Sequence, residues 1–304
     1  SAPLVTLGEG DTPLVFSKIA GREIGFKLDY LNPTGSFKDR GTAPLVSVLL
    51  SRGILSAVED SSGNAGASFA AYAAQAGIQA RVFVPDYAAG PKRAQIAAYG
   101  AELVRIAGPR SNATIAVQRA ADDGAAYASH VHQPFGLMGM ATIAYEIVAA
   151  LGSAPGTLVT PVGQGSLLLG AWRGFKALYR AGVIRDLPRL VGVQAAACAP
   201  IWAVFTAGAA GLSWVTERET AAEGVRIKNP IRGDLILQAV QESHGTMVAV
   251  EEKEIQPGRD ALAGLGYCVE PTSAIVWDGL NQVLKSAADP VVVMLTGSGY
   301  KSLE

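Results

Sequence analysis

Short apolar runs alternate with longer amphipathic stretches along almost the whole sequence. The run at residues 291–295 is entirely apolar, as expected of a strand that is covered on both faces. The stretch at residues 166–181 instead repeats its apolar side chains at a helical spacing. A strand, a helix and a second strand in succession form a right-handed crossover that leaves the two strands parallel. We therefore predict an α/β protein with mostly parallel sheets covered by helices on both faces.

The predicted elements fill most of the chain. Strands are expected at residues 23–30, 57–60, 81–84, 103–106, 157–162, 190–194, 247–250 and 291–295. Helices are expected at residues 38–50, 64–76, 91–100, 112–122, 137–151, 166–181, 234–243, 251–265 and 271–286, and irregular chain at 4–14 and 212–229. The length suits two moderate domains. We place residues 45–145 in a smaller α/β domain and residues 1–44 with 146–304 in a larger one, with ligand in the cleft between them.

Composition restricts the class of protein. Hydrophobic residues make up 49% of the sequence and charged residues 17%, so a large buried core is expected. A formal net charge of −1 argues against a nucleic-acid or anionic membrane partner. No apolar run is long enough to span a membrane, and the first residues lack the pattern of a signal peptide. Cys198 and Cys268 fit buried thiols of a reduced cytoplasmic protein, with a single disulfide as the alternative.

Residues 32–41 combine turn formers, a lysine and the start of a helix. Pro33 and Gly35 favour a tight bend, and helical spacing begins just after it. Lys38 therefore lies at a helix N-terminus, where the helix dipole disfavours its ammonium form. Partial burial beside Phe37 would lower the lysine pKa further, and a free amine is the group that forms Schiff bases. The structural alternative is a solvated lysine beside Asp39.

Three further loops follow strands and carry glycine and hydroxyl groups. Residues 61–64 and 163–166 each open a helix, so their backbone N–H groups suit an anion. We expect a carboxylate at the first loop and a phosphate at the second. Residues 296–299 end the last strand with two hydroxyls. A simple helix cap is the alternative for Ser62 and Ser166.

Two closely spaced histidines are candidate ligands of a metal ion. His130 and His132 lie two residues apart, which places them on one face of an extended segment. No third ligand is nearby in the sequence, so we predict ordinary polar packing and no metal site.

Taken together, these motifs resemble those of a known enzyme family. The lysine motif, NPTGSFKDRG, is similar to that of threonine synthases among the fold type II, tryptophan-synthase-β-like enzymes that use pyridoxal phosphate. The resemblance runs in order through residues 8–14, 32–41, 61–64, 161–166, 270–274 and 295–299.

The resemblance implies a role for each matching residue. Lys38 would hold pyridoxal 5′-phosphate as an internal aldimine and later move protons, with Phe37 packed near the ring. Asn64 would bond the 3-hydroxyl of the cofactor, and Thr296 would meet the pyridine nitrogen. The substrate carboxylate would lie near Ser61, Ser62, Gly63 and Asn64. The cofactor phosphate would be held by Gly163, Gln164, Gly165, Ser166 and Leu167.

The resemblance also implies an activity. We expect a lyase of amino-acid biosynthesis that converts O-phosphohomoserine and water to threonine and phosphate, as a cytoplasmic homodimer. A neutral hydroxyl at Thr296 suits elimination and replacement better than transamination. Met138 and Ala141 stand where threonine synthases usually have glutamate and lysine, and Glu59-Asp60 places acid where smaller residues are common. An amino-acid ammonia-lyase or a β-replacement enzyme with a different leaving group is therefore the alternative.

Two other classes of protein are also considered. A dinucleotide-binding protein would need a Gly-x-Gly-x-x-Gly loop followed at the right spacing by an acidic residue, which the sequence lacks. A catalytically silent, cofactor-bearing regulatory protein stays open because of Met138 and Ala141.

Overall fold

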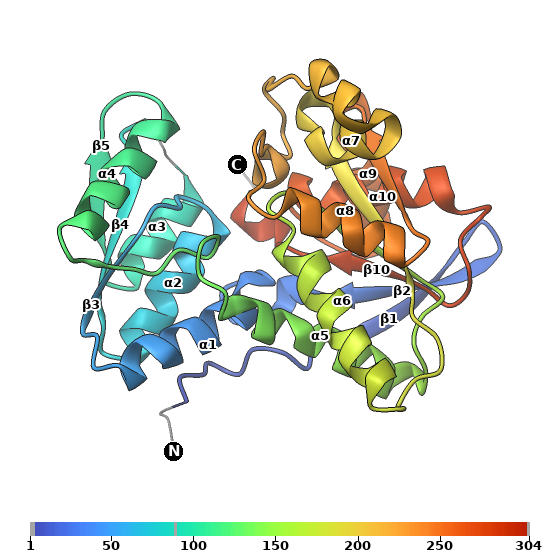
Figure 1. Cartoon of the computed structure of the whole chain (residues 1–304), viewed down its shortest axis with the longest axis horizontal. Helices are drawn as coiled ribbons and strands as arrows, with labels where there is room; N and C mark the ends of the chain where they lie inside the picture. The colour runs from blue at the N-terminus through green and yellow to red at the C-terminus, as the bar shows by residue number, and fades with distance from the viewer. Residues whose placement is uncertain (1–3, 88–89, 303–304) are drawn as a thin grey trace. The chain divides into compact units, whose positions relative to one another are not determined.

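The computed structural model describes residues 4–87 and 90–302, which form two compact units (Figure 1). The first unit contains the described residues up to Gly10 together with Asn32–Gly139. The second contains Asp11–Leu31 and the chain from Met140 onward. The division differs from the predicted one, because residues 4–10 and 32–44 belong to the first unit and residues 140–145 to the second.

The first unit is built on a four-stranded parallel sheet with strand order β5-β4-β3-β6. Its strands are β3 (Ser56–Glu59), β4 (Gln79–Pro85), β5 (Glu102–Ile106) and β6 (Ala126–Tyr127). Its helices are α1 (Lys38–Ser51), α2 (Asn64–Gln75), α3 (Pro91–Ala98) and α4 (Arg110–Asp122). Side chains of α1 and α2 form one apolar core with β4, and α4 covers a second, smaller cluster around Val58 and Phe83.

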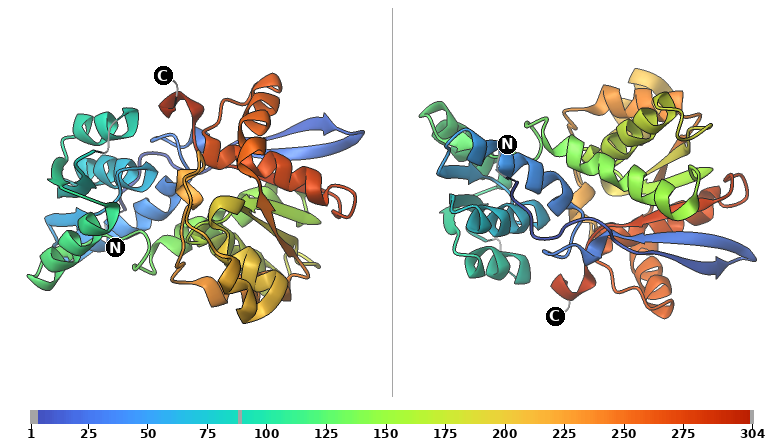
Figure 2. Two further views of the ribbon diagram at one scale, coloured as in Figure 1. Left: turned by 90° about the horizontal axis from the view of Figure 1, so that it is seen from above. Right: turned by 90° about the horizontal axis from the view of Figure 1, so that it is seen from below.

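The second unit is built on a six-stranded sheet with strand order β1-β2-β10-β7-β8-β9. Its strands are β1 (Leu14–Ile19), β2 (Arg22–Leu28), β7 (Thr157–Pro161), β8 (Arg189–Ala195), β9 (Thr246–Val250) and β10 (Val291–Leu295). Among the described strands of this sheet, only β1 pairs antiparallel, and it forms with β2 the blue hairpin that projects from the unit in Figure 2. The helices are α6 (Ser166–Arg180), α7 (Pro200–Ala207), α8 (Gly233–Glu242), α9 (Glu252–Gly264) and α10 (Pro271–Val283), while α5 (Gly136–Leu151) begins in the first unit.

The predicted alternation of strands and helices is confirmed, with bounds that differ by a few residues. Among the described strands and α-helices, strand β1, strand β6 and helix α7 were not predicted, and neither were the short 3-10 helices. Strand β1 is an edge strand in which most side chains are exposed or half-buried, so its sequence lacks a clear apolar face. Strand β6 has two residues, which is too short for any periodicity.

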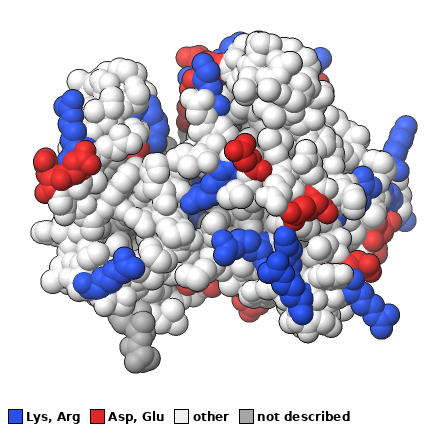
Figure 3. All heavy atoms as spheres, viewed as in Figure 1, with Lys and Arg blue, Asp and Glu red and all other residues white. Residues whose placement is uncertain are grey.

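The described surface carries both signs of charge. Figure 3 shows Lys and Arg interspersed with Asp and Glu on the face that is drawn. Among the described helices, none is both long and apolar enough to cross a membrane.

Candidate active site

A tight turn places Lys38 at the first residue of helix α1. The Gly35 N–H donates to the Asn32 carbonyl at 2.7 Å, which closes the bend around Pro33. Asp39 fixes the same bend, because its carboxylate accepts the Thr34 N–H at 2.7 Å and the Thr34 hydroxyl at 2.6 Å.

The lysine itself is half-buried, and the solvated alternative does not describe it. The Lys38 ammonium group lies 4.7 Å from the centroid of the Phe37 ring. Asp39 and Arg40, its predicted surface neighbours, are both buried. The predicted placement of Lys38 at a helix N-terminus beside an aromatic ring is therefore confirmed.

The loop at residues 61–64 lies next to this lysine turn. It follows β3, and helix α2 begins at Asn64. The Ser68 hydroxyl donates to the Thr42 hydroxyl at 2.7 Å. Ser68 lies one turn after Asn64 in α2, and Thr42 lies one turn after Lys38 in α1. The N-termini of α1 and α2 are therefore adjacent, with Lys38 and Asn64 at the same edge of the unit.

A glycine inside α2 holds this loop in place. A Cβ at Gly66 would lie 1.8 Å from the Ser61 carbonyl oxygen, so only glycine lets the helix approach the loop backbone this closely. Within the loop the Gly63 N–H donates to the Ser61 hydroxyl at 3.3 Å. The sequence did not single out Gly66 for this role, since the close approach depends on how the helix packs against the loop.

The glycine loop at residues 163–165 is shaped by neighbouring backbone and side chains of the second unit. A Cβ at Gly163 would lie 2.8 Å from the Gly224 carbonyl oxygen, and one at Gly165 would lie 2.3 Å from the Ile236 side chain. Gly165 also has φ +77°, a left-handed conformation that favours glycine. The Gln164 side chain accepts the Ile231 N–H at 3.1 Å, which ties the loop to the segment before α8.

Helix α6 begins immediately after this loop, at Ser166, and Leu167 is buried in its first turn. In the described part of the chain, neither α6 nor α2 has a side-chain hydrogen bond that caps its N-terminus. The cap alternative for Ser62 and Ser166 is therefore not observed. The first N–H groups of an uncapped helix suit an anion such as a phosphate.

Thr296 follows β10, the strand that lies beside β7 in the sheet. Its side chain is buried, and its N–H donates to the Ser273 hydroxyl at 2.8 Å. Because parallel neighbouring strands end at one edge, Thr296 and the loop at 163–165 share that edge. Gly297 packs directly on the Glu270 carboxyl group, which a Cβ there would meet at 2.1 Å. Ser273 and Glu270 belong to a motif in the sequence, but their contacts with this strand end were not predicted.

Two acids precede the loop at residues 61–64. Asp60 accepts hydrogen bonds from the Tyr127 hydroxyl at 2.7 Å and the Thr114 hydroxyl at 2.8 Å, and its carboxylate lies 3.6 Å from Arg110. Burial alone would raise the pKa of Asp60, but these hydrogen bonds and the Arg110 charge together lower it below its ordinary value. Burial also raises the pKa of Tyr127, as does the nearby Asp60 charge, so its hydroxyl stays a donor.

Glu59 pairs with one of the two histidines. Its carboxylate lies 2.6 Å from His130 Nδ1, while His132 is exposed and its ring lies 6.0 Å from that of Tyr127. No group of three potential metal ligands occurs among the residues that the structure describes. Cys198 and Cys268 are both free thiols, so the disulfide alternative is wrong.

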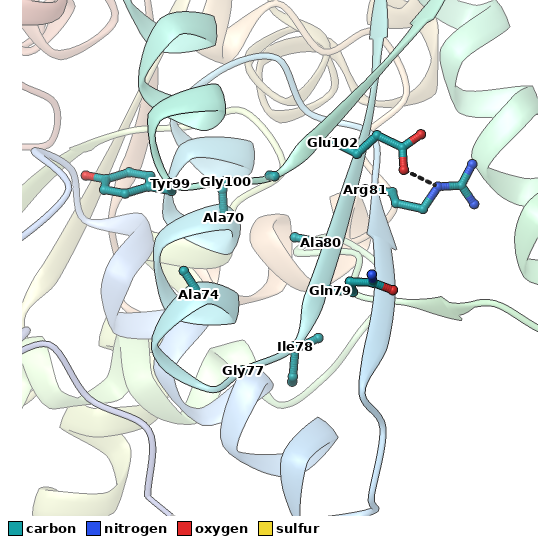
Figure 4. Close-up of a pocket in the computed structure, with 11 residues that line it drawn as sticks. Ala70, Ala74, Gly77, Ile78, Gln79, Ala80, Arg81, Tyr99, Gly100 and Glu102 are labelled. Carbon is teal, nitrogen blue, oxygen red and sulfur yellow. Dashed lines mark ion pairs between the residues drawn. The ribbon is translucent and has the colours of Figure 1, made fainter.

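The first unit also contains a cavity of about 350 Å³ at the opposite edge of its sheet. Figure 4 shows Gly77 and Gln79 beside it, at the end of α2 and the start of β4, with the Arg81–Glu102 ion pair at 3.3 Å. The predicted site residues lie instead at the carboxyl ends of the strands. This cavity is therefore separate from the candidate active site.

The described residues fit pyridoxal phosphate. A half-buried lysine at a helix N-terminus can bond an aldehyde, and the uncapped glycine loop before α6 can accept its phosphate. The Ser36 hydroxyl, two residues before Lys38, is fully buried and has no hydrogen-bond partner among the described residues. A buried hydroxyl of this kind is costly unless a further group bonds it.

Residues 5–297 match the family described as pyridoxal-phosphate dependent enzyme. The chain belongs to this family, and the predicted family and cofactor are confirmed. Among curated relatives, threonine synthase of Synechocystis sp. is 38% identical, covering 98% of this chain and 79% of that protein. Threonine synthase of Mycobacterium tuberculosis is 36% identical, with 98% and 83% covered.

Solved structures confirm the predicted fold type. Maize serine racemase superposes with a TM-score of 0.82 at 21% identity, covering 95% of this chain and 88% of that one. The threonine deaminase of T.th. superposes with a TM-score of 0.78 at 25% identity, covering 94% and 92%. The chain therefore has the fold type II architecture of pyridoxal-phosphate enzymes.

Proposed function

We propose that this chain is a pyridoxal-phosphate-dependent lyase that converts O-phosphohomoserine and water to threonine and phosphate. Curated threonine synthases at 34–38% identity over nearly the whole chain support this activity. The observation that carries the proposal is the half-buried Lys38 at the start of α1, beside the loop that begins α2.

The roles of the chain's own residues follow from this assignment. When bound, pyridoxal phosphate withdraws electrons from the bonds at the α-carbon of an amino acid. Lys38 Nζ would hold the cofactor at its aldehyde group, and its free amine would move the proton at the substrate α-carbon. The Phe37 ring would pack near the cofactor ring. Asn64 would hold the cofactor at its 3-hydroxyl group, and the Thr296 hydroxyl would hold it at its ring nitrogen.

Two loops hold the anionic groups. Ser61, Ser62, Gly63 and Asn64 bind the substrate carboxylate through backbone N–H and side-chain groups. Gly163, Gln164, Gly165, Ser166 and Leu167 bind the cofactor phosphate, largely through backbone N–H groups at the start of α6.

The first experiment is spectroscopic. The purified protein, incubated with pyridoxal phosphate, should absorb in the violet and lose that band on treatment with borohydride. The variant Lys38→Ala should show neither property and should be inactive. A wild-type protein that stays colourless with added cofactor would contradict the assignment.

The second experiment identifies the substrate. O-phosphohomoserine should give threonine and phosphate in equal amounts. The alternative, an ammonia-lyase, is favoured by Met138 and Ala141, which supply no cation at positions where threonine synthases usually have glutamate and lysine. Release of a keto acid and ammonia from serine or threonine, without turnover of O-phosphohomoserine, would establish that alternative.

We also infer a cytoplasmic homodimer from the family resemblance. Light scattering coupled to size-exclusion chromatography should give twice the mass of the 31.4 kDa chain. A monomeric mass at micromolar concentration would overturn the dimer.

A further inference from the structure

Glu59 and His130 form a carboxylate–imidazole pair at the end of the first unit's sheet. Glu59 is the last residue of β3 and its side chain is 1% exposed, whereas the His130 side chain is 25% exposed. The Glu59 Oε1 and His130 Nδ1 atoms lie 2.6 Å apart, which is a short hydrogen bond. The second carboxylate oxygen of Glu59 accepts the Asp60 N–H. Both oxygens of this buried acid are therefore used.

This pair lies at the same edge as the proposed substrate loop. Strands β3 and β6 are parallel neighbours, and the Ala128 N–H donates to the Val58 carbonyl at 2.8 Å where they end. His130 follows β6 just as residues 61–64 follow β3, and only Asp60 separates Glu59 from that loop. The imidazole therefore stands beside the loop that we assign to the substrate carboxylate.

The hydrogen bond fixes how the imidazole can act. An ionised carboxylate only accepts, so Nδ1 carries a proton and Nε2 faces away from Glu59. Among the described residues, the His130 ring has no hydrogen bond besides that to Glu59. A carboxylate that orients an imidazole in this way is the arrangement of an acid–base catalyst held by a third group.

The two neighbouring acids, Glu59 and Asp60, have different charged partners. Asp60, the next residue, points its carboxylate to Tyr127, Thr114 and Arg110, so the Arg110 charge is engaged there. Among the described side chains, His130 forms the one ion pair of the Glu59 carboxylate, and its ring also interacts electrostatically with the Asp60 carboxylate. Because Nδ1–H holds the ring against Glu59, Nε2 is the ring nitrogen from which a protonated imidazole can donate to a substrate.

We propose that His130 is the general acid that protonates the departing oxygen of the substrate, and that Glu59 is its positioning residue. This inference rests on the proposed function, because it assumes an amino-acid substrate bound by residues 61–64. As the carbon–oxygen bond breaks, its electron pair goes to the oxygen, which takes the Nε2 proton. The neutral imidazole then regains a proton from solvent water. Lys38 retains the proton transfers at carbon.

The experiment compares oxygen and chloride as leaving groups, because chloride departs without needing a proton. Holoenzymes of the wild type, His130→Gln and Glu59→Gln are compared on O-phosphohomoserine and on 2-amino-4-chlorobutanoate. The release of phosphate or chloride is followed in a single turnover. For His130→Gln we expect phosphate release to slow by about 100-fold or more and chloride release by less than about threefold. For Glu59→Gln we expect a loss of about tenfold, again with the oxygen leaving group alone.

The neighbouring histidine supplies the matched control. His132 is exposed and touches neither Glu59 nor the loop by any bond that the described residues show, so His132→Gln should stay within about twofold of wild type on both substrates. The violet absorption band of each variant confirms that the cofactor is bound. Equal losses on both leaving groups, or no loss for His130→Gln, would overturn the general-acid role.

A second pair of substrates separates this inference from the proposed function. If the wild type releases no phosphate from O-phosphohomoserine, the threonine-synthase assignment fails, and the same variants are compared on serine and 3-chloroalanine. A selective loss with serine then still supports His130. A holoenzyme that turns over neither oxygen-bearing substrate overturns both proposals.

Discussion

At the scale of single residues, Gly66 determines how closely helix α2 packs against the preceding loop at residues 61–64. Its missing side chain lets α2 contact the Ser61 carbonyl, which a Cβ would meet at 1.8 Å. Backbone atoms cannot move aside as the end of a flexible side chain can. The residues proposed to bind the substrate carboxylate therefore depend on a position that would not touch the substrate.

We predict that Gly66→Ala raises the KM for the amino-acid substrate at least tenfold and lowers the free energy of unfolding by about 1–3 kcal/mol, because the loop must shift. Steady-state kinetics and urea denaturation measure the two effects. Gly264→Ala is the matched control, since a Cβ at this helical glycine would have nothing within 4 Å. An unchanged KM in Gly66→Ala would mean that the loop does not bind the substrate.

Asp60 gives a second residue-scale prediction, on acid stability. Its pKa is lowered in the folded state, so its contribution is present above the unfolded-state pKa of about 4 and is lost as the pH falls through the folded value. Removing the Tyr127 hydroxyl weakens the hold on the carboxylate. Tyr127→Phe should therefore lower the free energy of unfolding by about 1–2 kcal/mol at pH 7 and by progressively less below pH 4.

Urea denaturation at several pH values checks this result. Tyr179→Phe is the control, because Tyr179 is 49% exposed. A Tyr127→Phe effect of equal size at pH 7 and at pH 3 would contradict the role of the Asp60 charge.

At the scale of elements, the start of α6 depends on the conformation of one glycine. Gly165 combines φ +77° with a contact that leaves no room for a side chain against Ile236 of α8. Helices α6 and α8 thus pack so that the loop backbone, and not a side chain, faces the place where a phosphate would bind. Substitution at Gly165 strains both the backbone and the packing.

Gly165→Ala should weaken pyridoxal phosphate binding at least tenfold, as measured by titration of the violet absorption band. The double variant Gly165→Ala with Ile236→Val relieves part of the steric clash but not the left-handed strain. We expect it to recover only part of the affinity. Full recovery would show that packing alone, and not backbone conformation, shapes the loop.

Local patterns in the sequence predicted the features that depend on residues close together in the chain. The lysine turn, the glycine loops and the apolar strand at residues 291–295 all follow from such patterns. The Gly66 contact and the Glu59–His130 pair join residues from different elements, so no local pattern contains them. Likewise none of the side chains of the edge strand β1 is fully buried, and its sequence gave no periodic signal.

At the scale of the whole molecule, the unit boundaries were the part that sequence predicted least well. Residues 11–31 belong to the second unit because β2 pairs with β10, more than 260 residues later in the chain. Nothing in a strand's own composition identifies so distant a partner.

A cofactor that binds only the folded protein should stabilise it against unfolding. At 100 times its Kd, a ligand that binds only the folded state adds about 2.7 kcal/mol. Pyridoxal phosphate should therefore raise the Tm of the wild type by several degrees, while Lys38→Ala should show a much smaller shift. Differential scanning calorimetry measures both, with pyridoxal, which lacks the phosphate, as the control ligand. An equal shift in both proteins would exclude a bond to Lys38.

The pairing of β2 with β10 also sets an order of events on the ribosome. Residues 32–139, which make up most of the first unit, have all emerged well before Val291–Leu295 are synthesised. The β1–β2 hairpin is synthesised before either the first unit's sheet or β10. Until β10 emerges, the β2 edge of the hairpin lacks its native partner strand. Nascent chains of this protein should thus carry a finished amino-terminal body and an open, association-prone ribbon until the last strand is released.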